Sequence, residues 1–290
     1  MTFKEQLNIR IQQLNSAEKL ILINVVCFVL PMLIKTVLFL FNISSTNFFN
    51  WFELSASWID LSTKPWSIIT YSFLHSGFFH LFWNMYLLFF SSKLFLNLFP
   101  SNTFFNVYFL GVVVGGITFI LSYTFFPAFQ NSSPVMIGAS AGVMAIFIFM
   151  STYSPDLEIR LILFNVKLRY LGIAFLLLDV VQIPYGNAGG HLAHLGGAIL
   201  GFYYVKQLKN GKDIGKPFKN FIDKIINIFR RKQKMRTVYK REKSQKTNKN
   251  ASDAGEKQKR IDAILDKISI SGYESLTQAE KDFLFKVGKS

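Results

Sequence analysis

The sequence predicts an all-α, polytopic membrane protein with six membrane-spanning helices, on the grounds of composition, charge distribution and the length of its apolar runs. The 290 residues are 51% hydrophobic and 16% aromatic, yet 17% are charged. Most lysines and arginines lie from Lys206 onward, so the net charge of +15 belongs mainly to the tail. This segregation leaves uninterrupted apolar runs, and a bilayer requires about 20 such residues for one helix.

Six apolar segments approach the length of a membrane span. They run roughly over residues 20–41, 78–99, 103–126, 138–152, 168–183 and 189–208. The fourth segment is short, which is expected of a central helix that its neighbours shield from lipid. An even number of spans places both termini on the same side of the membrane.

Loop charges predict which side that is. Lys19, Lys93 and Arg169 lie at the expected inner ends of the spans, whereas Lys64 is the basic residue of the opposite loops. The positive-inside rule therefore predicts that both termini are cytoplasmic. We expect a multi-pass protein of the cell (plasma) membrane.

A serine between small residues begins the fourth segment, in Gly138-Ala139-Ser140-Ala141-Gly142. The G-x-S-x-G pattern alone is a weak signal, because in soluble hydrolases it requires a strand, a turn and a helix. The topology assigned from lysine and arginine alone places Ser140 and His194 towards the same outer face. Ionisable groups inside a membrane are functional candidates, so this pair predicts a nucleophile and its base. The alternative is that the small residues only bring helices together.

The second segment adds polar groups at the same depth. His80 and Asn84 are four residues apart and share a helix face, so both can point into the bundle. Donors of this kind suit the oxyanion that acyl transfer creates. His75 lies just outside the span, and we expect a backbone carbonyl to satisfy its ring.

Three motifs, H-x-x-x-x-H-x-x-x-N in the second span, G-x-S-x-G in the fourth and A-H-x-x-G in the sixth, resemble the rhomboid intramembrane serine proteases. The resemblance implies a six-helix rhomboid-like bundle with Ser140 as nucleophile and His194 as general base. It implies that His80, Asn84 and the Ser140 backbone N–H stabilise the oxyanion. It also implies that His75 organises the long first loop by hydrogen bonding.

The resemblance covers roughly residues 20–208 and departs from the family pattern at two positions. Ser67 follows Trp66 where rhomboids often have an arginine, and Met144 stands four residues after the serine, where an aromatic residue is common. Neither departure removes a group required for catalysis. Both bear on the level of activity and on substrate preference.

The predicted function is an intramembrane serine endopeptidase that acts through a Ser-His dyad and an acyl-enzyme. Its expected substrates are single-span or multi-span membrane proteins, cut near the outer face where the substrate helix unwinds. The alternative is a catalytically silent rhomboid-like protein that binds membrane clients. A transporter is disfavoured because no inverted repeat is evident.

All four histidines lie in or beside the second and sixth segments, so a zinc site is a further alternative. A metalloprotease would show H-E-x-x-H, but Leu81 and Leu192 follow the candidate histidines. We therefore expect no metal and no cofactor. We expect Asp179 in the fifth span to pack between helices or face water, and His191 to line the outer entrance.

The first loop, residues 42–74, is long and holds Trp51, Trp58 and Trp66. Tryptophan concentrates at membrane interfaces. We expect this loop to lie partly in the outer leaflet and to flank the site.

The remaining segments predict attachment and regulation. The predicted organisation is an interfacial amphipathic segment (1–18), the six-span domain (19–208), a basic amphipathic segment (209–231), a disordered basic linker (232–259) and a small helical hairpin (260–290). The basic segment is expected to bind anionic lipid of the inner leaflet. Nucleic-acid binding is not expected, because no motif supports it. The hairpin is too small to be stable alone, so we expect it to dock on a partner, a second copy or the protease core.

Overall fold

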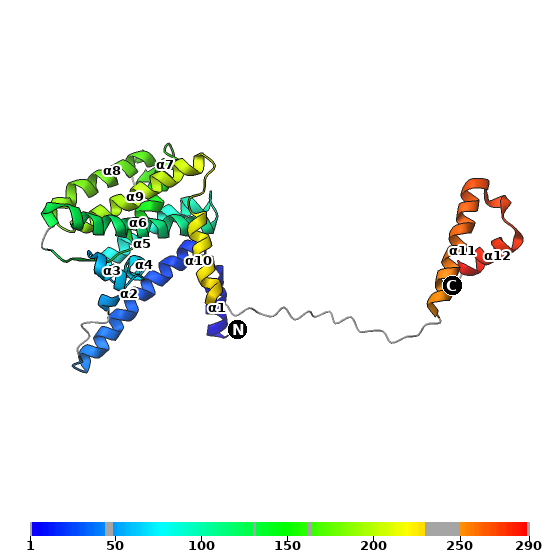
Figure 1. Ribbon diagram of the computed structural model, residues 1–290, viewed down its shortest axis with the longest axis horizontal. Helices are drawn as coiled ribbons and strands as arrows, with labels where there is room; N and C mark the ends of the chain where they lie inside the picture. The colour runs from blue at the N-terminus through cyan, green and yellow to red at the C-terminus, as the bar shows by residue number, and fades with distance from the viewer. Residues whose placement is uncertain (1, 44–48, 130–131, 162–163, 230–249, 289–290) are drawn as a thin grey trace. The chain divides into compact units, whose positions relative to one another are not determined.

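The computed structural model of the protein describes residues 2–43, 49–129, 132–161, 164–229 and 250–288 (Figure 1). The chain forms two compact units, Met1–Arg231 and Lys232–Ser290. The larger unit is a helical bundle that holds every candidate site residue. The smaller unit holds the two helices of the tail.

Each of the six predicted segments coincides with a helix. These helices are α2 (Ser16–Leu40), α5 (Phe78–Leu96), α6 (Ser101–Phe125), α7 (Ser140–Tyr153), α8 (Leu168–Gln182) and α9 (Ala188–Lys209). Among the described residues, three helical stretches are long and apolar enough to cross a membrane, namely Ser16–Leu40, Ser101–Phe125 and Leu168–Tyr185, and α7 is a shorter apolar helix. Mostly helical architecture is thus confirmed, whereas the count of six spans stays a prediction.

The outer face of the bundle is apolar, as the second predicted span illustrates. On α5, Leu81 and Leu88 are buried, whereas Phe79 and Trp83 are 74% and 61% exposed. Large exposed aromatic side chains on a helix face are unusual for a protein surrounded by water. Lipid is the solvent that such a face requires, so the protein is an integral membrane protein.

The centre of the bundle is α7, which packs against α6 and α9. Residues 141 to 151 of this helix are all buried. Glycines allow the backbones to approach closely: a Cβ at Gly197 would clash with the carbonyl oxygen of Ala141, and one at Gly115 would lie 2.5 Å from Ala141 Cβ and 2.9 Å from the Ala193 carbonyl oxygen. Three helices therefore meet beside Ser140 and His194.

The first loop folds against the bundle through short elements. These are η1 (Phe49–Trp51), β1 (Leu54–Ser55), α3 (Trp58–Thr63), α4 (Ser67–Thr70) and η2 (Tyr71–Phe73). Trp51 and Trp66 stack with ring centroids 6.3 Å apart, and Trp66 Nε1 donates to the Trp51 carbonyl at 2.8 Å. The Tyr71 hydroxyl donates to the Val112 carbonyl of α6 at 2.7 Å. The loop is thus tied both to itself and to the core.

The prediction of an all-α chain misses two small antiparallel sheets in the part of the chain that the structure describes. β1 pairs with β2 (Val135–Met136), and β3 (Glu158–Leu161) pairs with β4 (Phe164–Lys167). Strands of two to four residues are too short to show an alternating pattern in the sequence. The pairing of β1 with β2 anchors the first loop directly to the segment before Ser140.

Two further helices flank the bundle. α1 (Phe3–Gln13) begins with a capping box between Thr2 and Glu5. After α9, the Asp213 carboxylate accepts hydrogen bonds from the Tyr204 hydroxyl at 2.5 Å and from the Gly215 N–H at 3.0 Å, and α10 (Lys216–Phe229) follows and packs against α6. Both predicted amphipathic segments thus contain helices, while their contact with lipid stays a prediction.

The tail unit contains α11 (Asn250–Ser271), η5 (Tyr273–Ser275) and α12 (Gln278–Val287). Lys267 on α11 pairs with Glu280 on α12 at 2.9 Å, and Thr277 caps α12 as predicted. Residues 232–249 of the predicted linker lie outside the described residues. The predicted linker also includes residues 250–259, which are helical in the structure; this stretch has no apolar face and therefore leaves no periodic signal in the sequence.

His75 is a buried titratable group between η2 and α5. By strict donor and acceptor geometry neither ring nitrogen is paired within the described residues, but the Phe73 backbone lies near enough to act on the ring as a hydrogen-bond partner, so the expected backbone carbonyl bond stays a prediction. Burial lowers the pKa of His75 to about 4, His80 acts in the same direction, and the Phe73 backbone opposes them. The folded protein therefore holds this imidazole neutral.

We expect Gly197→Val to destabilise the bundle, because its side chain would force α9 away from α7. Overpacking of a tight contact costs about 1–3 kcal/mol. Unfolding followed by intrinsic fluorescence in detergent measures the loss. Gly77→Ala is the matched control, since a Cβ there meets nothing within 4 Å. Equal stability of the two variants would contradict the close packing.

We expect stability to fall between pH 6.5 and pH 4 in part through His75. The pKa is lower in the folded state than the ordinary value of 6.5, so the unfolded chain binds the proton first and stability decreases as pH falls through this window. A pKa difference between 6.5 and about 4 corresponds to a loss of about 3 kcal/mol. The melting temperature of His75→Phe should fall less steeply over this range than that of the wild type, and parallel curves would refute the assignment.

Candidate active site

Ser140 is the first residue of α7, and an unusual backbone conformation precedes it. Gly138 has φ +130°, a region that side chains with a Cβ rarely adopt. Its N–H donates to the Tyr71 carbonyl at 2.9 Å, so the first loop holds this conformation. The chain can therefore turn sharply into α7 and present Ser140 at the helix N-terminus.

Gly138 lies directly against the His80 ring, and the position that its missing Cβ would take is called here the space above Gly138. A Cβ built on this residue would be 2.9 Å from both Cε1 and Nε2 of His80 and 3.7 Å from Ser140 Oγ. The space is open only because residue 138 has no side chain. The structure thus brings the serine of the fourth predicted segment together with a histidine of the second.

The contacts of His80 determine which ring nitrogen carries a proton. The Ser76 N–H donates to His80 Nδ1 at 3.4 Å, and Ser76 Oγ lies 3.0 Å from the same atom. Because Nδ1 accepts a hydrogen bond, the neutral ring carries its proton on Nε2. The nitrogen that borders the space above Gly138 is therefore a donor.

Asn84 is buried one turn further along α5, at 8% exposure. Its Nδ2 donates to the His80 carbonyl at 2.8 Å, which is a contact within its own helix. This bond uses one of its two amide protons. Asn84 lies on the predicted face and is oriented by His80, and its role towards an oxyanion stays a prediction.

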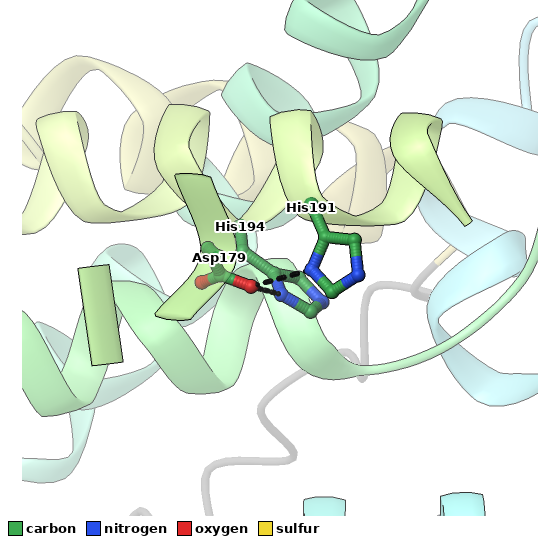
Figure 2. A group of neighbouring side chains, drawn as sticks. All are labelled: Asp179, His191 and His194. Carbon is green, nitrogen blue, oxygen red and sulfur yellow. Dashed lines mark hydrogen bonds and ion pairs between the residues drawn. The ribbon is translucent and has the colours of Figure 1, made fainter. Parts of the chain in front are cut away.

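Asp179, on α8, lies between two histidines of α9 (Figure 2). Its Oδ1 is 2.7 Å from His194 Nδ1 and 2.8 Å from His191 Nδ1. An ionised carboxylate only accepts hydrogen bonds, so both Nδ1 atoms act as donors. In the neutral His194 ring, Nε2 then has a free lone pair and can accept a proton.

Asp179 lies between helices, as one of the two expectations had it, and it does not face water. It is 7% exposed and bonds to both imidazoles. Residues on different helices approach only through the fold, so spacing along the chain could not place Asp179 beside His194. The available signal was a single carboxylate in the apolar spans. His191 was expected to line the outer entrance, and in the structure its Nδ1 is hydrogen-bonded to Asp179.

Ser140 and His194 come together through their neighbours. Ala141 follows the serine and Ala193 precedes the histidine. A Cβ on Gly115 would meet both alanines, so all three backbones are in close contact here. Within the described residues no hydrogen bond joins Ser140 to His194. In enzymes without substrate such bonds are often long and tighten on binding.

The two departures from the family pattern have structural counterparts. Ser67 is buried, and near it Lys64 Nζ lies 5.3 Å from the centroid of the Trp51 ring, which stacks on Trp66. The stack of Trp51 on Trp66 fixes the loop next to position 67, where an arginine is common in rhomboids. Met144 is 3% exposed and fills its place in the core.

Comparison with known proteins agrees with this architecture. A model of the Rhomboid domain matches residues 62–210, and a model of a family of unknown function (DUF6576) matches residues 244–289. Presenilin-associated rhomboid-like protein A, mitochondrial, from Danio rerio is 30% identical over 147 residues, which are 49% of this chain and 37% of that protein. The chain thus matches little more than a third of this relative. Because the Rhomboid domain match covers more than half of the chain, the protein belongs to the rhomboid family.

Proposed function

We propose that the protein is an intramembrane serine endopeptidase in which Ser140 is the nucleophile and His194 the general base. One observation supports this proposal most strongly. The hydrogen bonds around the space above Gly138 leave His80 Nε2 as a donor, and those around Asp179 leave His194 Nε2 as an acceptor. A proton acceptor and an oxyanion donor are the two groups that acyl transfer from a serine requires.

The proposed reaction has two stages. His194 Nε2 takes the proton of Ser140 as Oγ attacks a peptide carbonyl, and the resulting oxyanion occupies the space above Gly138. His80 Nε2–H and the Ser140 backbone N–H donate to this oxyanion, with Asn84 in support. His194 then gives the proton to the leaving amine and later activates the water that releases the acyl group.

Asp179 would act as a positioning residue in this scheme. Its bond to His194 Nδ1 fixes the tautomer and orients the ring, while its negative charge stabilises the imidazolium that forms. A serine-histidine pair suffices for the chemistry, so Asp179 would raise the rate without touching the substrate. His75 contacts the site through the edge of the His80 ring, at a centroid distance of 5.1 Å.

Rhomboid proteases act on membrane proteins, and we propose such substrates here, single-span or multi-span. Cytoplasmic termini would place Ser140 near the outer face, where a substrate helix must unwind locally to expose its peptide bond. In the same topology α10 would lie on the inner leaflet and attract anionic lipid through its lysines. The tail helices would dock on a partner, on a second copy of the chain or on the protease core.

We expect Ser140→Ala to abolish cleavage of a single-span model substrate in liposomes, by about 10⁴-fold or more, because the nucleophile is lost. Covalent labelling with a fluorophosphonate measures the same nucleophile without a substrate. Ser151→Ala is the matched control: Ser151 lies buried on the same helix and bonds to the Phe147 carbonyl at 3.0 Å, away from the site. Equal cleavage by wild type and Ser140→Ala, or no cleavage by the wild type, would reject the proposal.

We expect Gly138→Ala to lower kcat by about 100-fold or more, because its Cβ would fill the proposed oxyanion space and its φ would be strained. Steady-state cleavage in liposomes measures the effect, with the melting temperature as a check on folding. Unchanged kcat in a folded variant would place the oxyanion elsewhere.

A further inference from the structure

We propose that Asp179, His191 and His194 form a zinc site whose occupation switches the protease off. Metal binding stands on the geometry of these three side chains, whereas inhibition rests on the proposed function. The sequence led us to expect no metal, because no glutamate follows the histidines as in H-E-x-x-H. The fold supplies an acidic ligand from another helix.

The three residues present the ligand types that Zn²⁺ prefers. Each offers one ligand atom, and these atoms all lie within 4.8 Å of one another. Zinc bonds of about 2.0–2.1 Å place tetrahedral ligands roughly 3.3 Å apart. The Nδ1 atoms are 2.7 and 2.8 Å from Asp179 Oδ1, so small side-chain movements that open these distances would admit the ion. Two histidines and one carboxylate leave a fourth position for water.

The charge of the cluster also favours a cation. Asp179 is 7% exposed, and its hydrogen-bond and ion-pair partners in the described structure are two imidazoles rather than a lysine or an arginine. With both rings neutral the cluster carries one negative charge in a largely dehydrated place. A buried charge is costly unless a counter-charge or a metal compensates it. Zinc would convert this net charge from −1 to +1.

The protons can be followed through the binding step. Both Nδ1 atoms carry protons when they donate to Asp179, and zinc takes the lone pair that each Nδ1 has after losing its proton. Each ring regains a proton from solvent on Nε2, so the two neutral imidazoles change tautomer and no proton is released overall. The bonds formed are those from zinc to two nitrogens and one oxygen.

This change of tautomer would remove the general base. In the metal-free cluster, His194 Nε2 has a free lone pair for the Ser140 proton. With zinc on Nδ1, Nε2 carries a hydrogen and can only donate. Ser140 then keeps its proton, and acylation stops. The metal would thus be inhibitory, the opposite of its role in a metalloprotease.

Metal binding can be measured independently of activity. Full-length protein, purified with a tag that contains no histidine, is titrated with Co²⁺ and then with Zn²⁺, and the visible absorption of tetrahedral cobalt reports occupancy. We expect one Co²⁺ per chain, displaced by Zn²⁺. His191→Phe should weaken binding by about 100-fold or more, since even outer-shell changes cost 10–100-fold. His75→Phe, which removes a buried histidine outside the cluster, should bind like the wild type.

Cleavage and fluorophosphonate labelling then test inhibition, each variant being compared with its own zinc-free rate. Zinc should inhibit the wild type with the affinity of the spectral titration, and His191→Phe should require about 100-fold more zinc. Chelation should restore activity to zinc-treated protein. Absent cobalt bands, or equal binding by His191→Phe, would overturn the site.

Two further outcomes separate this inference from the proposed function. If zinc occupies the site of an active wild-type protein and cleavage does not slow, the inhibitory role is overturned. Wild-type protein that neither cleaves nor labels in the absence of metal would refute the proposed function, while the cobalt titration would still decide whether the site exists.

Discussion

The contact between the backbones of α7 and α9 is the constraint on which the rest of the structure depends. Gly197 lies against the carbonyl oxygen of Ala141, and Gly115 of α6 fits between Ala141 and Ala193. Side chains larger than hydrogen would separate these helices and, with them, Ser140 from His194. Membrane helices gain little from the hydrophobic effect among themselves, so close packing of small residues is a principal source of their association.

The polar groups of the site depend on that packing for their protonation as well as their position. His80 accepts at Nδ1 from Ser76, whereas His194 donates from Nδ1 to Asp179. Two chemically identical rings thereby differ at Nε2, which is a hydrogen-bond donor in His80 and an acceptor in His194. In a water-poor interior such assignments persist, because an unpaired polar group would be costly there. The same Asp179 contact that orients His194 also makes the cluster attractive to a cation.

The first loop is part of the site rather than a cover over it. Tyr71 donates its hydroxyl to the Val112 carbonyl and accepts from the Gly138 N–H through its own carbonyl. These two bonds connect α6, the loop and the turn before Ser140. The positive φ of Gly138 is thus fixed from outside the helix that it precedes, which explains why a short motif alone is a weak signal.

The sequence by itself determined the helical class and the positions of the six apolar helices, and it predicted Ser140, His80 and His194 as candidate site residues, because apolar periodicity and motif spacing are local properties of a chain. It could not determine the short β pairings, the helical start at Asn250 or the place of Asp179. Tertiary structure decided the last of these, since a carboxylate on α8 and two imidazoles on α9 meet only when the helices pack. Hydrogen-bond partners, which decide the tautomer of each ring, likewise exist only in the folded chain.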